Sequence, residues 1–496
     1  MKEHPLHPIF HPRTVALFGV PSSPGAWGGM FHRSLLASGF DKERMFLINP
    51  KADEISGLPC YAELPAIPAD IDHVISLVPA RVVPELVDQC IAKGVRSLHL
   101  FTAGFSETGD ADMARVEHES IEKLRAAGIR TIGPNCLGLY CPASGLTFSE
   151  EFPMELGNVC LISQSGANAG GIIRNLAPLG VRFSKAVSFG NGADLKAHDF
   201  FDYAASDPQT EVVISYLEGV GDGRELFDAL KRCAAVKPTI ILKGGLSGAG
   251  ARAANSHTGS LAGSREVFEA VCRQTGALRV DSMEELYDLT VGITTGLRTI
   301  AGRRVVLVGG PGGFAVLSAD EIAAQELEMP ETPAKAKEQL REFIPVAGTS
   351  VDNPIDGHPR GPDEMERTMH ILCDSDHYDV VFSTSLGSDP GGGFHRRRRA
   401  ATQQLQDAAS DKSPEEIAAA EAERARKGAK MLARLQGEVG VPIVYVQRGF
   451  GESADRQAAA AYAEGIAAYP TVLRAARTTR RLLEWRARRE GLPVVF

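Results

Sequence analysis

Short apolar runs, each followed by a stretch of helical periodicity, recur along almost the whole of this sequence. The segment 14–18 (TVALF) is one such run, and 212–217 (VVISYL) and 305–308 (VVLV) are others. A strand that is apolar along its whole length needs cover on both faces, which parallel sheets obtain from flanking helices. The alternation therefore predicts an α/β protein built from doubly wound parallel sheets.

The alternation restarts twice, which predicts three domains. We expect strands at 14–18, 45–48, 74–78, 98–101 and 130–132, then at 159–162, 184–189, 212–217 and 239–242, and finally at 305–308, 380–382 and 443–446. A connector with Pro and Gly at 142–157 follows the first set, Gly302 precedes the third, and a basic helix closes the chain near Arg489. At about 150 residues per domain the length of 496 residues agrees, and we place the domains at 1–150, 151–300 and 301–496.

One segment of the third domain departs from this rhythm. Residues 388–438 contain a Gly run, four consecutive arginines (396–399) and a long Ala/Glu/Arg pattern that predicts a helix from Ser413. We interpret the segment as an insertion. The arginine run is more typical of a solvated helix face than of an anion site.

Composition and charge narrow the class of ligand and the compartment. A net charge of -9 and a pI near 5.9 do not favour nucleic acid or an anionic membrane surface. Eight cysteines without a CxxC pair indicate thiols in a reducing compartment, and no secretory signal or apolar run of spanning length is found, so we expect a cytoplasmic protein. His4, His7 and His11 lie among prolines, and we expect a loose tail there rather than a metal site.

The first strand ends in a turn that suits a nucleotide. It runs into Gly19-Val-Pro-Ser-Ser-Pro-Gly25 and then a helix, where strand-end amides and a helix N-terminus can face phosphates. The turn lacks the GxGxxG pattern, and Lys51 stands near the second strand end where an NAD site has an acidic residue. A cation there suits the 3′-phosphate of coenzyme A, although NADP or a simple solvent lysine fits as well.

A second turn follows the first strand of the second domain. The strand NVCLI leads into Ser163-Gln164-Ser165-Gly166 and a helix, so amides and hydroxyls gather at a helix start. Such a turn can seat a phosphoryl group, and it can equally be a plain N-cap.

The stretch 244–264, GGLSGAGARAANSHTGSLAGS, combines small residues with one titratable side chain, His257. Small residues leave such a segment free to move. A neutral imidazole is a nucleophile near pH 7, and a carboxylate can fix its tautomer. Glu218, at the end of the strand ISYLE, is a candidate for that carboxylate.

Taken in order, these motifs resemble a known family. VALFGVPSSPG, NPKADE, LVPA, FTAGFSE, GPNCLG, SQSGA, SFGNGAD, YLEG, GARAANSHTGSLAGS and RVDSMEELYDL follow one another as in the NDP-forming acyl-CoA synthetases, which are related to succinyl-CoA synthetase. The resemblance covers about residues 12–354 and returns over 441–486. It implies a Rossmann-like CoA-binding domain followed by two flavodoxin-like CoA-ligase domains.

The resemblance also implies roles for individual residues. His257 matches the phosphorylated histidine and Glu218 the carboxylate that steadies it. The matched phosphate-binding residues are Ser163, Gln164, Ser165, Gly166, Gly312 and Gly313, the last two in a strand-end glycine turn that could also be a close-packed turn without ligand. The matched CoA-site residues are Gly19, Ser22, Gly25, Lys51, Val78, Pro79, Asn135, close to the thiol, and Asn191.

The family's reaction converts acyl acid, CoA and NTP into acyl-CoA, NDP and phosphate, reversibly, through an acyl phosphate and a phosphohistidine. It needs an ATP-grasp domain for ATP or ADP and Mg²⁺, which the three predicted domains do not include, so we expect a separate ATP-grasp partner subunit and a hetero- or homo-oligomer. We expect no metal site on this chain itself. The alternatives are a CoA-binding or acyl-CoA-sensing protein without turnover and a nicotinamide oxidoreductase, which Lys51 and the missing GxGxxG disfavour.

Overall fold

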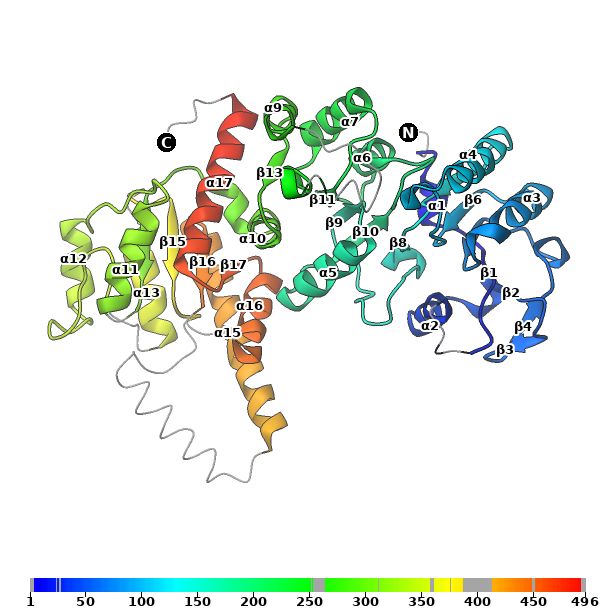
Figure 1. Cartoon of the computed structure of the whole chain (residues 1–496). Coiled ribbons are helices and arrows are strands. Elements are labelled where there is room, and N and C mark those ends of the chain that lie inside the picture. Colours follow the sequence, from blue (N-terminus) through cyan, green and yellow to red (C-terminus); the bar gives the residue numbers. More distant parts are fainter. Residues whose placement is uncertain are drawn as a thin grey trace. The chain divides into compact units, whose positions relative to one another are not determined.

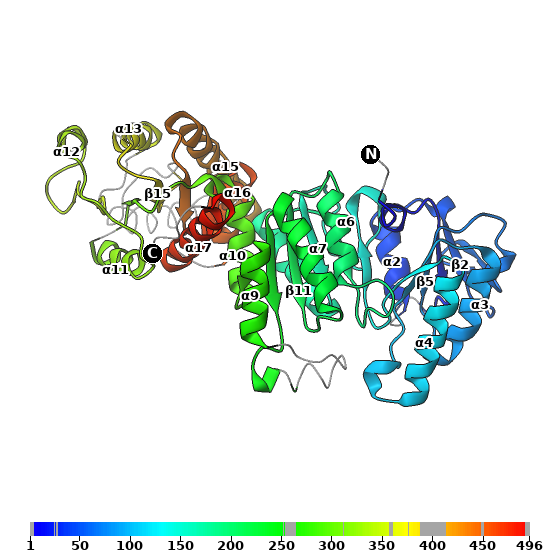
Figure 2. The same ribbon diagram turned by 90° about the horizontal axis from the view of Figure 1, so that it is seen from above.

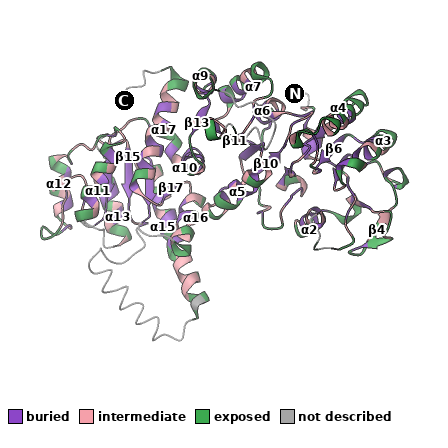
Figure 3. Ribbon diagram, in the orientation of Figure 1, coloured by how far each residue is buried: buried purple, intermediate pink, exposed green. Residues whose placement is uncertain are grey.

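The computed structural model describes residues 4–23, 25, 28–250, 252, 264–310, 312–356, 361–374, 376–386, 413–447 and 451–491. The chain forms two compact units, one of Met1–Ala177 with Arg182–Leu286 and one of Pro178–Val181 with Tyr287–Phe496. In each unit buried strands form sheets that helices cover (Figures 1 and 3), which confirms the predicted fold class. Among the described residues no helix has the length and apolar character that crossing a membrane requires.

The first sheet of unit 1 has seven strands in the order β3-β4-β2-β1-β5-β6-β7. Its strands are β1 (Val15–Phe18), β2 (Met45–Ile48), β3 (Glu54–Ile55), β4 (Leu58–Tyr61), β5 (His73–Ser76), β6 (Ser97–Leu100) and β7 (Arg130–Ile132), with helices α2 (Gly29–Ala37), α3 (Val83–Lys93) and α4 (Ala111–Ala126). Without the antiparallel β3, the parallel strands numbered along the chain lie as 3-2-1-4-5-6. This is the order of a Rossmann sheet, and the strand order reverses between β1 and β5.

The second sheet of unit 1 has the order β13-β12-β11-β9-β10-β8. It contains β8 (Gly138–Tyr140), β9 (Val159–Ser163), β10 (Phe183–Ser188), β11 (Val212–Leu217), β12 (Thr239–Lys243) and β13 (Leu278–Val280). Its parallel strands lie as 2-1-3-4-5, the flavodoxin-like order. Helices α6 (Ala197–Ser206), α7 (Gly223–Val236) and α9 (Arg265–Thr275) lie side by side on one face (Figure 2). Right-handed crossovers put α5 (Gly166–Leu176) on the other face.

Unit 2 contains a parallel sheet in the order β14-β15-β16-β17. Its elements are β14 (Val305–Val308), β15 (Val380–Ser383), β16 (Ile443–Val446) and β17 (Ala467–Tyr469), with α11 (Gly312–Ala323), α12 (Ala334–Arg341), α13 (Pro362–Cys373), α15 (Pro414–Val439), α16 (Glu452–Ala463) and α17 (Val472–Glu490). Helix α10 (Met283–Ile293) spans the division between the units. Parallel bridges from β14 to Ile355 and from Arg304 to Glu328 lie on the free side of β14 and complete a flavodoxin-like pattern.

Helix α15 confirms the helix predicted from Ser413, whose side chain accepts a hydrogen bond from the Glu416 amide as the N-cap. The helix is more than a surface addition, because Ala425, Leu432 and Leu435 are buried in the core of unit 2. It is the crossover between β15 and β16. The rest of the predicted insertion that precedes it, including Arg396–Arg399, lies outside the described residues apart from Ser413.

All twelve predicted strands are present, with ends displaced by two residues at most. Within the described part of the chain, five further strands were not predicted, namely β3, β4, β8, β13 and β17. They are two to four residues long, and such short segments carry too little of a periodic signal. Strand β8 precedes the expected boundary at 150 yet pairs antiparallel with β10 of the second sheet. The bounds of the three domains themselves stay predictions.

The expectation of a loose N-terminal tail is wrong for the described residues from His4 onward. Helix α1 (His7–Phe10) buries Ile9 and Phe10. The Phe10 ring stacks on Tyr203 of α6 with the centroids 4.8 Å apart, and the buried Lys185 ammonium lies 5.8 Å from the centre of the Phe10 ring. Lys185 in turn pairs with the buried Asp207 at 2.6 Å. The N-terminal segment is therefore held against the second sheet and its helix α6 by the buried side chains of Ile9 and Phe10.

Candidate active site

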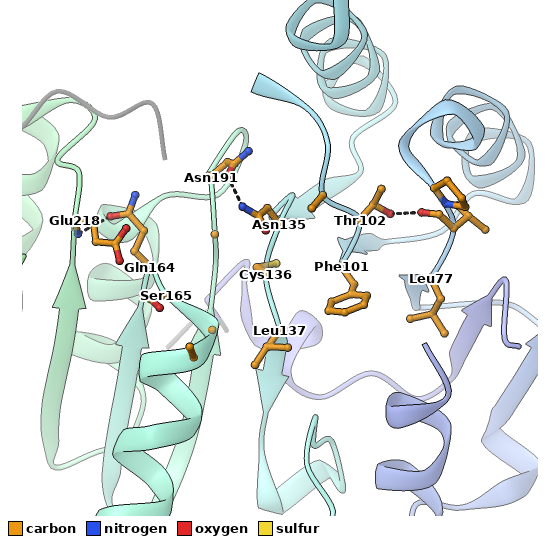
Figure 4. Close-up of a pocket in the computed structure, with 16 residues that line it drawn as sticks. Leu77, Phe101, Thr102, Asn135, Cys136, Leu137, Gln164, Ser165, Asn191 and Glu218 are labelled. Carbon is orange, nitrogen blue, oxygen red and sulfur yellow. Dashed lines mark hydrogen bonds between the residues drawn. The ribbon is translucent and has the colours of Figure 1, made fainter. Parts of the chain in front are cut away.

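A pocket of about 520 Å³ lies between the two sheets of unit 1 (Figure 4). Its lining residues are Leu77, Val78, Pro79, Phe101, Thr102, Ala103, Asn135, Cys136, Leu137, Gln164, Ser165, Gly166, Ala167, Gly190, Asn191 and Glu218. One wall is largely apolar, and Figure 4 shows Phe101 between Leu137 and Leu77 in this view. The other wall carries the amides of Gln164 and Asn191 and the carboxylate of Glu218.

Strand order explains why the pocket is here. In the first sheet the lining begins directly after β5 and β6, and in the second it begins directly after β9 and β11. In each sheet these strand ends lie at or beside the point where the strand order reverses. Helices leave in opposite directions at such a point and open a crevice at the carboxyl edge of the sheet. Two such crevices face each other here.

Glu218 is held at its backbone by side chains from two neighbouring strands. The Gln164 Oε1 atom accepts hydrogen bonds from the Glu218 amide at 2.8 Å and from the Gly219 amide at 2.7 Å. The Lys243 ammonium donates to the Glu218 carbonyl and to the Gly244 carbonyl, both at 2.6 Å. Lys243 thus ties the Glu218 turn to the start of the small-residue segment that contains His257.

The Glu218 carboxylate has a neighbour that sequence reasoning missed, Tyr216. Its hydroxyl hydrogen-bonds Glu218 and Asn168, and a Cβ on Gly244 would stand 2.9 Å from the Tyr216 oxygen. Burial is the largest cause that raises the pKa of Tyr216 to about 12, followed by the Glu218 charge and the hydrogen bond with Glu218. Burial lowers the pKa of Lys243, and the Glu218 charge opposes that shift.

The predicted phosphate turn is the start of α5. Ser165 is the N-cap, and its hydroxyl accepts a hydrogen bond from the Asn168 amide at 3.3 Å. Ser163 is fully buried and donates to the Ser165 carbonyl at 2.7 Å, so it supports the turn from below. Gly166 is required by close packing, because a Cβ there would stand 2.7 Å from Leu137. The helix N-terminus and Glu218 face the same pocket, which places the positive end of a helix dipole near a negative charge.

Asn135 and Asn191 join the loops of the two sheets. The Asn135 Nδ2 atom donates to Asn191 Oδ1 at 3.4 Å, and the Asn191 backbone amide donates to the Pro134 carbonyl at 3.0 Å. Gly190 makes this approach possible, because its φ is +56° and a Cβ would lie 2.2 Å from the Pro134 oxygen. The two asparagines therefore lie side by side in the lining of the pocket.

Several predicted CoA-site residues lie along the carboxyl edge of the first sheet outside the pocket lining. Gly19 has a φ of +87°, and a Cβ there would overlap Val78, which does line the pocket. Asn49, which sequence reasoning did not select, donates to the Val20 carbonyl at 2.8 Å and to the Ser22 hydroxyl at 3.3 Å. Ser22, Gly25 and Lys51 are exposed.

Three further predicted site residues are not among the described lining residues of this pocket. Gly312 and Gly313 begin α11 in unit 2. His257 lies outside the described residues. Among the pocket residues that were missed, Phe101 is the last residue of the predicted strand 98–101 and Thr102 follows it, so the strand end was a usable signal.

Within the described residues, one cluster of possible metal ligands occurs in unit 2, made of Glu366, His370 and Glu438. Arg434 pairs with Glu366 at 2.6 Å and with Glu438 at 2.9 Å. The guanidinium already pairs with both carboxylates, so the cluster is an ion-pair network between α13 and α15 and carries no metal assignment.

Two family models match the chain. A CoA binding domain model matches residues 13–142, and a succinyl-CoA ligase like flavodoxin domain model matches residues 156–292. These ranges contain, respectively, the parallel strands of the first sheet and those of the second. The fold and the pocket between the sheets thus define a CoA-binding, succinyl-CoA-ligase-like α/β protein.

Similar proteins narrow this class. Acetate–CoA ligase [ADP-forming] II subunit alpha of Pyrococcus furiosus is 35% identical over 76% of this chain and 81% of that protein. Acetate–CoA ligase [ADP-forming] I of Archaeoglobus fulgidus is 36% identical over 76% of this chain and 54% of its own length. A solved structure of an acetyl-coenzyme A synthetase from Ca. Korarchaeum cryptofilum, in complex with phosphate and ADP, matches with a TM-score of 0.78 and 29% identity over 98% of this chain and 97% of that chain.

The chain belongs to the ADP-forming acyl-CoA synthetase family, as the order of motifs predicted. It spans about half the length of relatives such as the A. fulgidus ligase and most of the P. furiosus subunit alpha.

Proposed function

We propose that this chain is the CoA- and phosphoryl-handling subunit of an NDP-forming acyl-CoA synthetase. It would interconvert acyl-CoA, phosphate and NDP with carboxylic acid, CoA and NTP. The observation that carries the proposal is the pocket of unit 1, where the edge of a CoA-binding sheet faces Glu218 and the N-terminus of α5. A thioester bound at the edge of the first sheet would lie next to a phosphate-binding site formed by residues of the second sheet.

CoA is proposed to lie along the carboxyl edge of the first sheet. Lys51 and Ser22 would meet the phosphorylated ribose end, and Gly19 and Gly25 would let the backbone approach the diphosphate. Val78 and Pro79, which line the pocket, would contact the pantetheine arm. Asn135 and Asn191 would then flank the thiol end.

The chemical steps are proposed as two substitutions. A phosphate oxygen attacks the thioester carbonyl and the C–S bond breaks, so CoA leaves and an acyl phosphate forms. A nitrogen of His257 then attacks phosphorus and the P–O bond breaks, so the carboxylic acid leaves. The α5 N-terminus with Gln164, Ser165 and Gly166 would offset the phosphoryl charge, at about 0.3–2 kcal/mol for a dipole end. Glu218 would hold the His257 ring. Gly312 and Gly313, in unit 2, stay predicted phosphate-binding residues by resemblance alone.

Nucleotide is proposed to bind to a separate ATP-grasp subunit, with Mg²⁺ coordinated there rather than on this chain. Two relatives from P. furiosus are named as alpha subunits, and this chain covers 81% and 76% of them. It covers only 54% and 49% of two other relatives, ligases that are not named as subunits. This difference in coverage is what a two-subunit arrangement produces. A cytoplasmic location is proposed with it, since all eight cysteines are free thiols.

The test is transfer of labelled phosphate to the full chain. Incubation with acetyl-CoA or larger acyl-CoAs and radioactive phosphate should give an acid-labile, base-stable label and free CoA. His257→Ala should abolish the label while the affinity for CoA stays within about twofold, because the imidazole is the acceptor and not part of the CoA site. CoA binding without any label in the unmodified chain would instead support a CoA-binding protein without turnover, and an undiminished label in His257→Ala would overturn the assignment of the acceptor.

A further inference from the structure

A chain of amide and carboxylate groups leads from Glu107, in the 3-10 turn η4 (Ser106–Thr108) that precedes α4, to the pocket. The Glu107 Oε2 atom accepts a hydrogen bond from Asn191 Nδ2 at 2.8 Å, and Glu117 lies 3.5 Å from the same nitrogen. Asn191 Oδ1 accepts from Asn135 Nδ2 at 3.4 Å. Glu107 is itself fixed, because its Oε1 atom accepts from the Gly104 amide at 2.5 Å and its Oε2 atom from the Phe105 amide at 3.2 Å.

The chemistry of these groups settles which way each amide faces. An ionised carboxylate only accepts hydrogen bonds, so Asn191 must turn its NH₂ group toward Glu107 and its oxygen toward Asn135. Asn135 must then turn its own NH₂ group toward Asn191. Burial opposes ionisation of Glu107, but hydrogen bonds from Gly104 and Asn191 hold its pKa below the usual value. Glu107 is therefore ionised, and its carboxylate determines the orientation of the two asparagine amides.

We propose that Glu107 is a positioning residue that, through Asn191, makes Asn135 present its Oδ1 atom to the pocket as an acceptor for an amide N–H of the ligand. Asn135 lines the pocket, and among the described residues no hydrogen bond is recorded to its Oδ1 atom. A ligand that fits must bring a donor to that point between apolar contacts. The pantetheine arm of CoA has this chemistry, with an amide N–H next to the cysteamine carbons. The choice of CoA as the ligand rests on the proposed function.

Replacing Glu107 by the isosteric glutamine should reverse the orientation of the Asn191 and Asn135 side-chain amides. We call this chain of hydrogen bonds from Glu107 through Asn191 to Asn135 the relay. The bond from the Gly104 amide, at 2.5 Å, is much shorter than the bond from the Phe105 amide, at 3.2 Å, so the oxygen of the introduced side chain stays with Gly104 and its NH₂ group faces Asn191. Asn191 then turns its oxygen toward the introduced amide and its NH₂ toward Asn135, and Asn135 turns its NH₂ to the pocket. The pocket would lose its acceptor without losing volume.

The experiment compares CoA with an analogue in which an ester replaces the amide nearest the thiol and so removes its N–H. Calorimetric titration of the full chain should show CoA binding about tenfold more tightly than the ester. Glu107→Gln should reduce this ratio to about one, and so should Asn135→Gly, which removes the acceptor at a position whose φ of +57° suits glycine. Glu119→Gln, an exposed change on the same helix as Glu117, should keep the ratio near tenfold.

The outcomes separate the two proposals. CoA binding with no preference over the ester in the unmodified chain, or a preference that survives in Glu107→Gln, overturns the positioning role of Glu107 and leaves the proposed function intact. Absence of CoA binding to the unmodified chain overturns the CoA assignment itself. If Glu107→Gln fails to fold, Asn191→Leu replaces it, because it interrupts the relay by removing the amide that links Glu107 to Asn135; a ratio that stays near tenfold in Asn191→Leu overturns the positioning role of Glu107.

Discussion

Gln164 illustrates how one side chain can determine the geometry of a site at the scale of a residue. Its Oε1 atom takes both the Glu218 and the Gly219 amides, and the side chain is almost fully buried. Buried amides that lose their acceptor cost about 1–3 kcal/mol. Gln164 therefore contributes to stability and to the position of Glu218 at once.

We expect Gln164→Met, which keeps the side-chain volume but removes the acceptor, to lower the thermal midpoint by a few degrees. Phosphate labelling should slow by about tenfold, because Glu218 is no longer held, while the affinity for CoA should change little. Differential scanning calorimetry and the labelling assay measure the two effects. Full labelling at an unchanged midpoint would show that the two amides find another acceptor.

At the scale of an element, strands β5 and β6 carry two buried histidines, His73 and His99, whose lowered pKa values make the stability of the first sheet depend on pH. Burial, followed by the charge of the neighbouring histidine, lowers the pKa of His73 to about 3. Burial also lowers the pKa of His99 to about 4, although its hydrogen bond to the Cys136 carbonyl opposes this. Both rings are neutral in the folded chain at neutral pH, and the two rings stack with centroids 6.4 Å apart.

His73 and His99 take up protons near pH 6.5 in the unfolded chain but stay neutral in the folded chain. Their neutral burial therefore lowers the free energy of unfolding only below about pH 6.5, and above that pH no stability is lost through them. The loss grows as the pH falls toward 4 and then 3, with a slope of up to about 1.4 kcal/mol per pH unit for each histidine. Urea midpoints of the full chain at about pH 7 and pH 5 should show the loss, and His73→Asn should reduce the slope by about one proton. A slope that is the same in His73→Asn would contradict this explanation.

Helix α15 shows at the same scale why composition can mislead. Its Ala/Glu/Arg sequence is typical of a solvated helix, and its capping box predicts where it begins. Small apolar residues nevertheless line one stripe, and Ala425, Ala429, Leu432 and Leu435 are all buried. The stripe becomes visible as core only once β15 and β16 are known to be neighbours.

At the scale of the whole molecule, the chain divides into two compact units, and all residues of the pocket belong to unit 1. A ligand that binds the folded form stabilises what it contacts. We expect saturating CoA to slow hydrogen exchange at the carboxyl ends of β5, β6, β9 and β11, with little change in β14 to β17. Mass spectrometry on the full chain with and without CoA tests this, and equal protection of the unit 2 sheet would contradict a CoA site confined to unit 1.

The extent of prediction differs between fold and site for a physical reason. Apolar runs and glycine turns are local signals, so they located the twelve predicted strands and the strand ends that carry Glu218, Gln164 and Asn135. The short edge strands β3 and β8 lack such a signal and form because a neighbouring strand is already present to pair with them. The partners of the site residues are likewise not local.

The sequence by itself determined the fold class and the strand ends at which polar side chains gather, because periodicity and turn residues act over a few positions. The family followed from the resemblance of its ordered motifs to those of a known family. Only the tertiary structure decided which strand ends face each other across the pocket. Glu107 and Asn191 are 84 positions apart and meet at 2.8 Å. No pattern along the chain encodes that meeting, since it depends on how two sheets pack rather than on the residues between them.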